Sequence, residues 1–321
     1  MKEKRYKYLW KKAQNEDIIR RAWKNLRKNK TKRKSVLNID ANLDSEIKAM
    51  KQMIRDTVPE NPEKGYQPPK IRKTKIVHEH GKRRTAHLAD IREQWYFHII
   101  VEVLKPIVIR RLSENSCGCI PGRGAHSGKR NLQKLIRKDK VRYVFKGDVR
   151  HFYDNIRIDV VIRELRKDIA DERFLYLIRK IYLYRNKGIL IGLYISPWLA
   201  NYVLITVDKI IEETPGVHLI RYVDDIVAVS TNKRTLQKLI PQIIRELGHL
   251  RLKLKRTYQV FKFDYITRNK DRIGRPIDFM GFVFFREKTI IREQIMLSAT
   301  RTARRLKKSK GAGQKVLCKS S

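Results

Sequence analysis

Apolar residues recur at helical spacing over much of this chain. Ile47, Met50, Ile54 and Val58 follow one another at intervals of three or four residues, which predicts an amphipathic helix that ends at the next proline. Residues 113–128, rich in Gly, Ser and Cys, are expected to form turns. The other predicted helices cover 1–40, 92–112, 158–169, 172–184, 196–207 and 233–248.

β-branched and aromatic residues predict strands elsewhere. Tyr143–Val149 is one strand by this criterion, and Val217–Val223 and Ile226–Ser230 form a pair with only two residues between them. A basic β-hairpin is predicted over 71–88, and short strands are predicted around 279–285. Strands that pair with one another, with helices packed on them, predict an α+β fold.

The charge of the chain predicts a polyanionic partner. Its 321 residues include 75 Lys and Arg against 33 Asp and Glu, a formal net charge of +42, while 41% of the residues are hydrophobic and can form a core. Residues 1–40 hold fifteen Lys or Arg and four acids, and residues 301–321 hold eight Lys or Arg and no acid. A field of this size indicates a nucleic-acid partner rather than charge kept for solubility.

Membrane and secretory signals are not expected. No apolar run approaches the ~18 residues of a membrane-spanning helix, and the basic N-terminus leads into no apolar stretch. The three cysteines, Cys117, Cys119 and Cys318, are too few for a disulfide scaffold, so we expect a cytoplasmic protein. A zinc site at Cys117, Cys119 and His126 is disfavoured because the spacing is wrong and a fourth ligand is not evident.

Three aspartates stand where a structural role does not require them. Asp224 and Asp225 lie between two apolar strands, where both carboxylates would be ionised and repel each other. Asp148 ends the strand that begins at Tyr143. Carboxylate oxygens suit Mg²⁺, and such a group fits a two-metal site for phosphoryl transfer. A solvated turn at Asp224-Asp225, and an N-cap or salt bridge at Asp148, are the alternatives.

Several segments resemble the reverse transcriptases. Arg221-Tyr222-Val223-Asp224-Asp225-Ile226 looks like their Tyr-x-Asp-Asp hairpin, and residues 145–156 resemble their first catalytic strand, with an aromatic residue five positions after the Asp. Further similar pieces follow in the order of that family, over about 70–285. These pieces are the basic segment 81–92, the turn 116–126, the segment 188–201 and the strand 278–282.

The resemblance implies a right-hand polymerase with an antiparallel palm sheet, fingers and a short or incomplete thumb. Residues 1–70 would be a basic helical extension and 71–140 the fingers. Residues 141–285 would be the palm, with part of the fingers at about 158–190. Residues 286–321 would be a short, basic, thumb-like tail.

The resemblance also implies roles for individual residues. Asp148, Asp224 and Asp225 would be catalytic and hold two Mg²⁺ ions, assisted by the carbonyl of Val149. The implied nucleotide-binding residues are Lys82, Arg84, Tyr153, Ile191 and Gly192. The implied template- and primer-binding residues are Arg92, Arg123, Tyr222, Met280 and Gly281. Lys255 lies near the place of a lysine that protonates pyrophosphate in some members. Core packing of Tyr153 and a solvated charge run at Lys82 remain alternatives.

The implied function is DNA synthesis on an RNA template by two-metal phosphoryl transfer. Its partners would be an RNA template, a DNA or RNA primer and dNTPs, with an accessory protein or a cognate structured RNA left open, and no membrane. Ile191-Gly192, in place of Gln-Gly, resembles diversity-generating retroelement enzymes, whereas Ser196-Pro197 resembles intron-encoded and retron-like relatives. A bacterial or phage retroelement and phage defence are the two roles considered. The alternative function is a catalytically inactive palm-fold RNA-binding scaffold.

Overall fold

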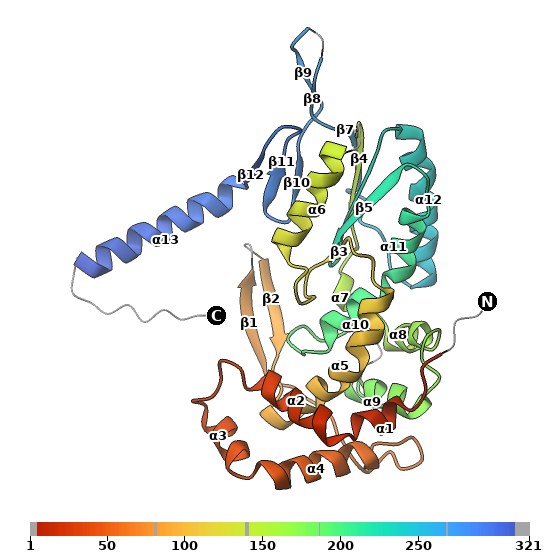
Figure 1. Cartoon of the computed structure of the whole chain (residues 1–321), viewed down its shortest axis with the longest axis vertical. Helices are drawn as coiled ribbons and strands as arrows, with labels where there is room; N and C mark the ends of the chain where they lie inside the picture. The colour runs from red at the N-terminus through yellow and green to blue at the C-terminus, as the bar shows by residue number, and fades with distance from the viewer. Residues whose placement is uncertain (1–4, 80–81, 139–140, 186, 268, 312–321) are drawn as a thin grey trace.

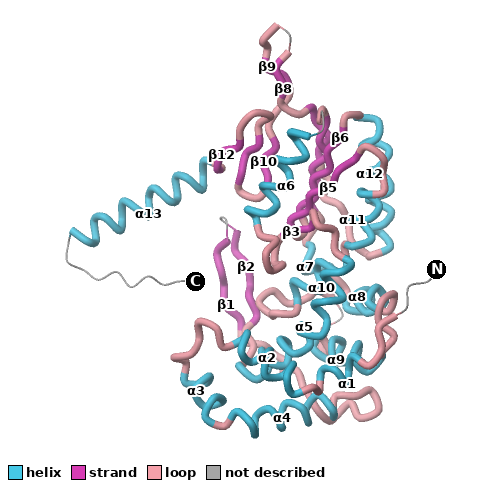
Figure 2. Tube along the Cα trace, in the orientation of Figure 1, coloured by secondary structure: helices cyan, strands magenta, loops and turns pink. Residues whose placement is uncertain are grey.

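The chain folds into a helical half and a half built around a sheet. Figure 1 shows them below and above along the longest axis, and Figure 2 shows most strands gathered in the upper half. The predicted α+β fold is therefore confirmed. The computed structural model describes residues 5–79, 82–138, 141–185, 187–267 and 269–311.

The lower half is built around α5 (Ile91–Arg111), whose side chains are buried along most of its length. Trp95 of α5 lies 4.8 Å from Trp23 between ring centroids and donates its indole N–H to the carbonyl of Ile19 at 2.9 Å. The N-terminal helices therefore share one core with the region predicted as fingers. The other helices here are α1 (Leu9–Ala13), α2 (Glu16–Leu26), α3 (Lys34–Ala41), α4 (Leu43–Asp56), α7 (Phe152–Asn155), α8 (Ile158–Leu165), α9 (Glu172–Ile181) and α10 (Ser196–Val203).

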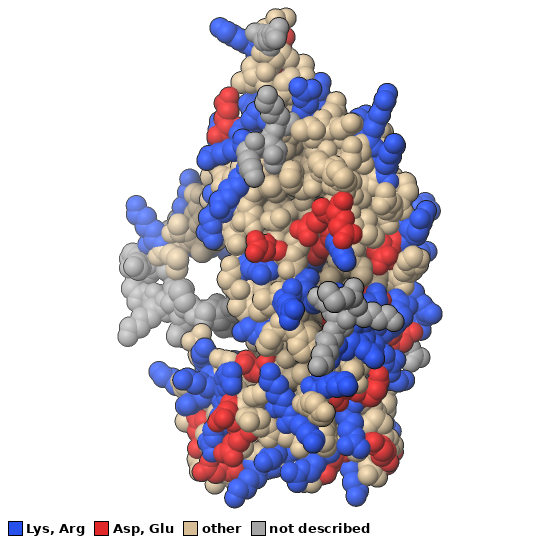
Figure 3. All heavy atoms as spheres, turned by 45° about the vertical axis from the view of Figure 1, so that its right-hand side comes forward, with Lys and Arg blue, Asp and Glu red and all other residues tan. Residues whose placement is uncertain are grey.

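On the face shown in Figure 3, Lys and Arg are most densely gathered on this helical half. In Figure 3, Lys and Arg crowd the lower part of the molecule, with fewer Asp and Glu among them, while the part above shows more uncharged surface. The basic residues of 5–40 thus lie on folded helices and the turns between them rather than on a free tail.

The main sheet carries the predicted aspartates. Its strand order is β3 (Ser116–Cys117), β5 (Val217–Tyr222), β6 (Asp225–Ser230), β4 (Tyr143–Asp148) and β7 (Gln259–Lys262). Neighbouring strands are antiparallel except β3, which is parallel to β5. The three strands predicted around the aspartates are confirmed, with Asp225 as the first residue of β6 rather than part of the turn.

Both faces of the sheet are covered, which is why β6 is apolar almost throughout. Ile226 and Ala228 pack in one cluster with residues of α12 (Lys233–His249), on the side that also holds α11 (Ile205–Glu212). Val227 and Val229 pack in a second cluster with Leu132 of α6 (Ala125–Lys138).

The expected turn region at 113–128 is wrong in part. It contains β3, and α6 begins within it at Ala125. The sequence interpretation missed α6 because basic residues separate its few apolar positions. The helix predicted over 196–207 is likewise two helices, α10 and α11.

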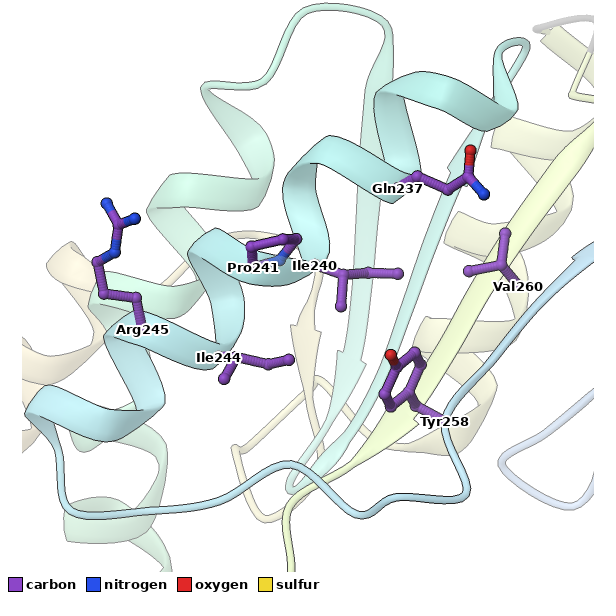
Figure 4. Close-up of a pocket in the computed structure, with 7 residues that line it drawn as sticks. All are labelled: Gln237, Ile240, Pro241, Ile244, Arg245, Tyr258 and Val260. Carbon is purple, nitrogen blue, oxygen red and sulfur yellow. The ribbon is translucent and has the colours of Figure 1, made fainter.

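A shallow groove of about 580 Å³ lies between α12 and β7 (Figure 4). Ile244 and Tyr258 are exposed in it, so hydrophobic surface of the α12 layer is open to solvent there. Its lining residues are Gln237, Ile240, Pro241, Ile244, Arg245, Tyr258 and Val260.

Three smaller sheets and a projecting helix complete the fold. The hairpin of β1 (Thr74–Glu79) and β2 (Lys82–His87) rises beside the gap between the two halves in Figure 1. The other strands are β8 (Tyr265–Ile266), β9 (Arg272–Ile273), β10 (Ile277–Phe279), β11 (Phe282–Phe284) and β12 (Thr289–Ile291). Helix α13 (Glu293–Gly311) extends away from the body.

The predicted segment limits at 70, 140 and 285 stay predictions. Within the described ranges, no helix combines the length and the apolar character needed to cross a membrane.

Candidate active site

The three predicted aspartates meet at the same end of the main sheet. Asp148, the last residue of β4, is directly opposite Asp225, the first residue of β6, in the antiparallel register. The amide of Val149 donates to the carbonyl of Asp224 at 3.3 Å, which holds the hairpin turn beside the end of β4. Val223, next to Asp224, has a left-handed backbone with φ 57°. Strand pairing and turn geometry therefore bring the three carboxylates together.

Asp224 and Asp225 lie in an environment that disfavours their charged forms. Burial raises the pKa of Asp224, and the neighbouring Asp148 raises it further. Burial raises the pKa of Asp225 to about 6, with added contributions from Asp148 and Asp224. Nearby cations only partly oppose these shifts, Lys255 and Arg84 for Asp224 and Lys146 for Asp225.

Lys255 occupies one side of this aspartate cluster. Its Nζ lies 2.6 Å from Oδ1 of Asp148 in an ion pair. The amide of Lys255 also donates to the carbonyl of Asp148 at 2.8 Å. The lysine is thus fixed to the end of β4 through both backbone and side chain.

The cluster suits a divalent cation in chemistry, although its side chains are not arranged as a finished metal site. In the described part of the chain, no group of three or more His, Cys, Asp or Glu side chains has the geometry to hold a metal ion as it stands. The raised pKa values of Asp224 and Asp225, next to Asp148, nevertheless fit a site that a cation would complete. Asp148, Asp224, Asp225 and the Val149 carbonyl would hold Mg²⁺ there, and this assignment stays a prediction.

Tyr153 lies beside the aspartates on α7. Burial raises the pKa of its phenol, and Cys119 and Asp224 raise it further, which places all three groups close together. The ring also packs on the main core and contacts Phe152 edge-on at 5.8 Å. Tyr153 therefore borders the site and contributes to the core at the same time.

Ile191 and Gly192 contact the end of the β1–β2 hairpin. The amide of His87, at the end of β2, donates to the carbonyl of Ile191 at 2.7 Å. Gly192 has φ +102°, and a Cβ on it would lie 2.5 Å from the carbonyl oxygen of His87. The backbone at the end of β2 therefore approaches Gly192 so closely that a side chain would not fit there. The predicted contact of Gly192 with a nucleotide stays a prediction.

The predicted basic residues of the fingers differ in their surroundings. Arg84 is exposed on β2 and lowers the pKa of Asp224, so it faces the aspartate cluster. The side chain of Lys82 lies outside the described residues. Arg92 donates from Nε to Glu46 at 2.8 Å and so ties α5 to α4. The template role of Arg92 stays a prediction.

The remaining predicted residues lie at the end of β5 and in two turns next to the sheet. Arg123 donates to the carbonyl of Ser113 at 2.9 Å, and the half-buried Tyr222 packs against the α6 side of the sheet. Met280 and Gly281 form the turn between β10 and β11 with φ 53° and 80°. Their contacts with template or primer stay predictions.

Sequence reasoning missed Arg221 as part of the site. This arginine is fully buried in β5 directly before the hairpin turn, where it pairs with Asp208. The available signal was a charged residue within an otherwise apolar strand, which requires a buried partner.

The fold and the position of the aspartates match the arrangement of a right-hand polymerase fold. Residues 71–284 match the family model described as "Reverse transcriptase (RNA-dependent DNA polymerase)". The chain therefore belongs to the reverse transcriptase family, whose members are nucleotidyltransferases.

Two curated relatives match parts of the chain. Protein YkfC of Escherichia coli (strain K12) is 26% identical over 161 residues, which cover 46% of this chain and 42% of that protein. The "Uncharacterized 91 kDa protein in cob intron" of Schizosaccharomyces pombe is 31% identical over 142 residues, 41% of this chain and 17% of that protein. The chain thus spans less than half the length of either relative.

Solved structures of Candida Tropicalis telomerase share the fold. The structure in complex with a TWJ fragment of telomeric RNA matches with a TM-score of 0.50 and 14% identity, covering 69% of this chain and 44% of the telomerase chain. The apo structure matches with a TM-score of 0.50 and 13% identity, covering 69% and 47%. At this identity the likeness concerns the fold alone.

Proposed function

We propose that this chain is an RNA-directed DNA polymerase that extends a DNA or RNA primer with dNTPs on an RNA template. The observation that carries the proposal is the direct pairing of Asp148 with Asp225, beside Asp224, in a member of the reverse transcriptase family. Asp148 and burial raise the pKa values of Asp224 and Asp225, a bound cation would offset this repulsion, and phosphoryl transfer uses such cations.

In the proposed reaction, the primer 3′-hydroxyl attacks the α-phosphorus of the dNTP, the bond to the β-phosphate breaks, and pyrophosphate leaves. Two Mg²⁺ ions bound at Asp148, Asp224 and Asp225 would activate the hydroxyl and stabilise the leaving oxygen. Arg84 would bind the triphosphate, and Tyr153 would close the space that a ribose 2′-hydroxyl needs. Lys255, next to Asp148, is placed to donate a proton to the departing pyrophosphate.

For the biological role, we propose a bacterial or phage retroelement of the diversity-generating type, acting in the cytoplasm. Ile191 before Gly192 supports this role, because an aliphatic residue there lacks the polar side chain that relatives place under the base pair. Phage defence is the competing role, and an accessory protein or a cognate structured RNA would be an additional partner in either.

Primer extension tests the activity. The purified chain is incubated with a DNA primer annealed to an RNA template and Mg²⁺, with dNTPs or with NTPs. We expect extension with dNTPs only, and a loss of at least about a thousandfold in Asp224→Asn, because electrostatic stabilisation at the reacting centre is worth several kcal/mol. Asp44→Asn, an exposed carboxylate on α4, is the matched control and should retain the wild-type rate.

The outcomes separate the candidate functions. Full activity in Asp224→Asn would refute the assigned site. RNA binding without extension under any condition would favour the inactive scaffold, and extension with NTPs would favour an RNA polymerase. Sequencing of the DNA product then tests the diversity-generating role. Enzymes of that type copy template RNA with frequent errors at adenines, so the role requires more errors opposite template adenines than opposite the other bases.

A further inference from the structure

Arg221 is a charged residue that is completely buried within the β5 strand. Its side chain is 0% exposed and that of its partner Asp208, on α11, is 2% exposed. The two are joined twice, from Nε to Oδ1 at 2.6 Å and from Nη2 to Oδ2 at 2.7 Å. A buried ion pair rarely adds net stability compared with apolar packing, so its presence beside an active site suggests a geometric role.

The guanidinium also holds the catalytic turn. Its Nη1 donates to the carbonyl of Val223 at 2.7 Å, two residues ahead in the chain. Val223 is β-branched and has φ 57°, a left-handed conformation that is unfavourable for such a residue and persists only when its surroundings impose it. The carbonyl held by Arg221 belongs to the peptide that carries the amide of Asp224. Arg221 therefore sets the orientation of the peptide from which Asp224 projects.

A second turn is linked to the first through Asn201 of α10. Asn201 accepts from Nη1 of Arg221 at 3.0 Å and donates to the carbonyl of Gly118 at 3.2 Å. The amide of Val223 donates to the carbonyl of Cys117 at 3.0 Å, directly across this second turn. The turn 117–119 and the turn 222–225 are thus joined by one backbone bond and by the Arg221–Asn201 link.

The two turns also pack closely on each other at Gly118. A Cβ added to Gly118 would lie 2.7 Å from Cγ2 of Val223. Cys119 continues the second turn with φ 58° and borders Tyr153, the residue predicted at the nucleotide sugar. The two turns therefore carry the aspartate cluster on one side and a wall of the nucleotide pocket on the other.

We propose that Arg221, held by Asp208, is a positioning residue that acts with Asn201 to fix the catalytic turn relative to the 117–119 turn. Arg221 and Asn201 set the position of the Asp224 carboxylate relative to the bound dNTP through the backbone of the turn. This inference rests on the proposed polymerase activity.

Asn201→Ala tests the link without disturbing the ion pair. Tyr202→Phe is the matched control: it removes a buried hydrogen bond to Asp168 from the next residue of the same helix, and it lies outside both turns. Two readouts are measured, deuterium uptake of peptides covering 116–124 and 221–226, and the single-turnover rate of adding one dNTP at saturating dNTP.

For Asn201→Ala we expect faster exchange in both turns and a rate about fivefold lower, because a hydrogen bond that orients the catalytic turn is lost. The half-saturating concentration of primer–template should not change. Tyr202→Phe should lower the melting temperature and leave both readouts at wild-type values. Arg221→Lys keeps a charge beside Asp208 but loses the fork, so its rate should fall further than that of Asn201→Ala.

The two readouts distinguish failure of this inference from failure of the proposed function. If the wild-type enzyme extends primers while Asn201→Ala behaves like Tyr202→Phe, the positioning role is wrong. If the wild-type chain makes no DNA while Asn201→Ala loosens both turns, the polymerase proposal fails and the link between the turns stands. Unchanged exchange in both Asn201→Ala and Arg221→Lys would refute the link itself.

Discussion

At the residue scale, the aspartate cluster is a source of instability in the metal-free protein. Asp225 and Asp224 both have raised pKa values, because burial and mutual repulsion disfavour their charged forms. The folded pKa of Asp225 lies above its unfolded value, so the folded state binds the extra proton. Its contribution to stability is therefore present at low pH and is lost as the pH rises through about 6.

Asp225→Asn should therefore stabilise the metal-free protein at pH 7 while removing its activity. Each pKa unit corresponds to about 1.4 kcal/mol, which makes a gain of about 3 kcal/mol an upper limit. Urea unfolding in a chelator at pH 7 and pH 4 measures it, and the gain should largely disappear at pH 4. An equal gain at both pH values would show that charge is not its cause.

His98 gives an opposite pH dependence. Its ring is stacked on Tyr194 at 3.6 Å between centroids, and its Nδ1 is buried without a hydrogen-bond partner among the described residues. Burial, with a smaller contribution from Lys30, lowers its pKa to about 3. The unfolded chain then takes up the proton first as the pH falls below about 6.5, so stability is lost toward acid pH.

Replacing His98 with Phe should remove this acid sensitivity while keeping a ring against Tyr194. Between pH 7 and pH 5, the wild-type free energy of unfolding should fall by about 2 kcal/mol more than that of His98→Phe. Urea unfolding at the two pH values gives the difference. Parallel losses in both proteins would mean that the imidazole is not buried in its neutral form.

At the scale of elements, the hairpin of β1 and β2 contacts the body of the protein at Gly192. Gly192 combines a left-handed backbone with a close approach to the carbonyl of His87, the last residue of β2. The neighbouring bond from His87 to Ile191 fixes the same contact. The orientation of β1 and β2 thus depends on a residue distant from them in sequence.

Gly192→Ala should loosen the hairpin and destabilise the fold by at least about 1 kcal/mol, because the new Cβ meets His87 and the backbone is strained. Gly216→Ala is the control, since Gly216 also has a positive φ, +71°, but has open space around it. Deuterium uptake over 74–87 should rise only in Gly192→Ala. A rise of the same size in both variants would assign the effect to backbone strain alone.

At the scale of the whole molecule, positive charge covers the helical half and extends onto the projecting α13. The described cations on the last turns of α13 are Arg301, Arg304, Arg305 and Lys307, all of them exposed. Because α13 lies away from the body, these charges are available to a nucleic acid without any change in the core.

Replacing those four residues with Ala should weaken binding of an RNA–DNA duplex and reduce its salt dependence. The slope of log K against log salt should fall by up to about 3, since each phosphate contact contributes about 0.7–0.9. Filter binding over a salt series measures the slope, and the melting temperature should stay unchanged. The control replaces four exposed cations on α12 with Ala and should leave the slope unaltered; these are Lys233, Arg234, Lys238 and Arg245. An equal decrease of the slope in both variants would show nonspecific attraction only.

The sequence by itself determined the secondary structure around the aspartates, the basic character and the family. The apolar segments on both sides of Asp224 and Asp225 predict two strands and a short turn from local sequence alone. The net charge is a sum over residues, so it too does not depend on how the chain folds. Helix α6 escaped prediction because its apolar positions are few, and its burial comes from the sheet beneath it.

Only the tertiary structure decided which residues meet. The pairing of Asp148 with Lys255, the contact of Gly192 with His87, and the bonds of Arg221 to Asp208 and Asn201 all join segments that are separate in sequence. Such contacts depend on the order and register of the strands and on how the helices pack on them. The spacing of residues along the sequence does not determine these features.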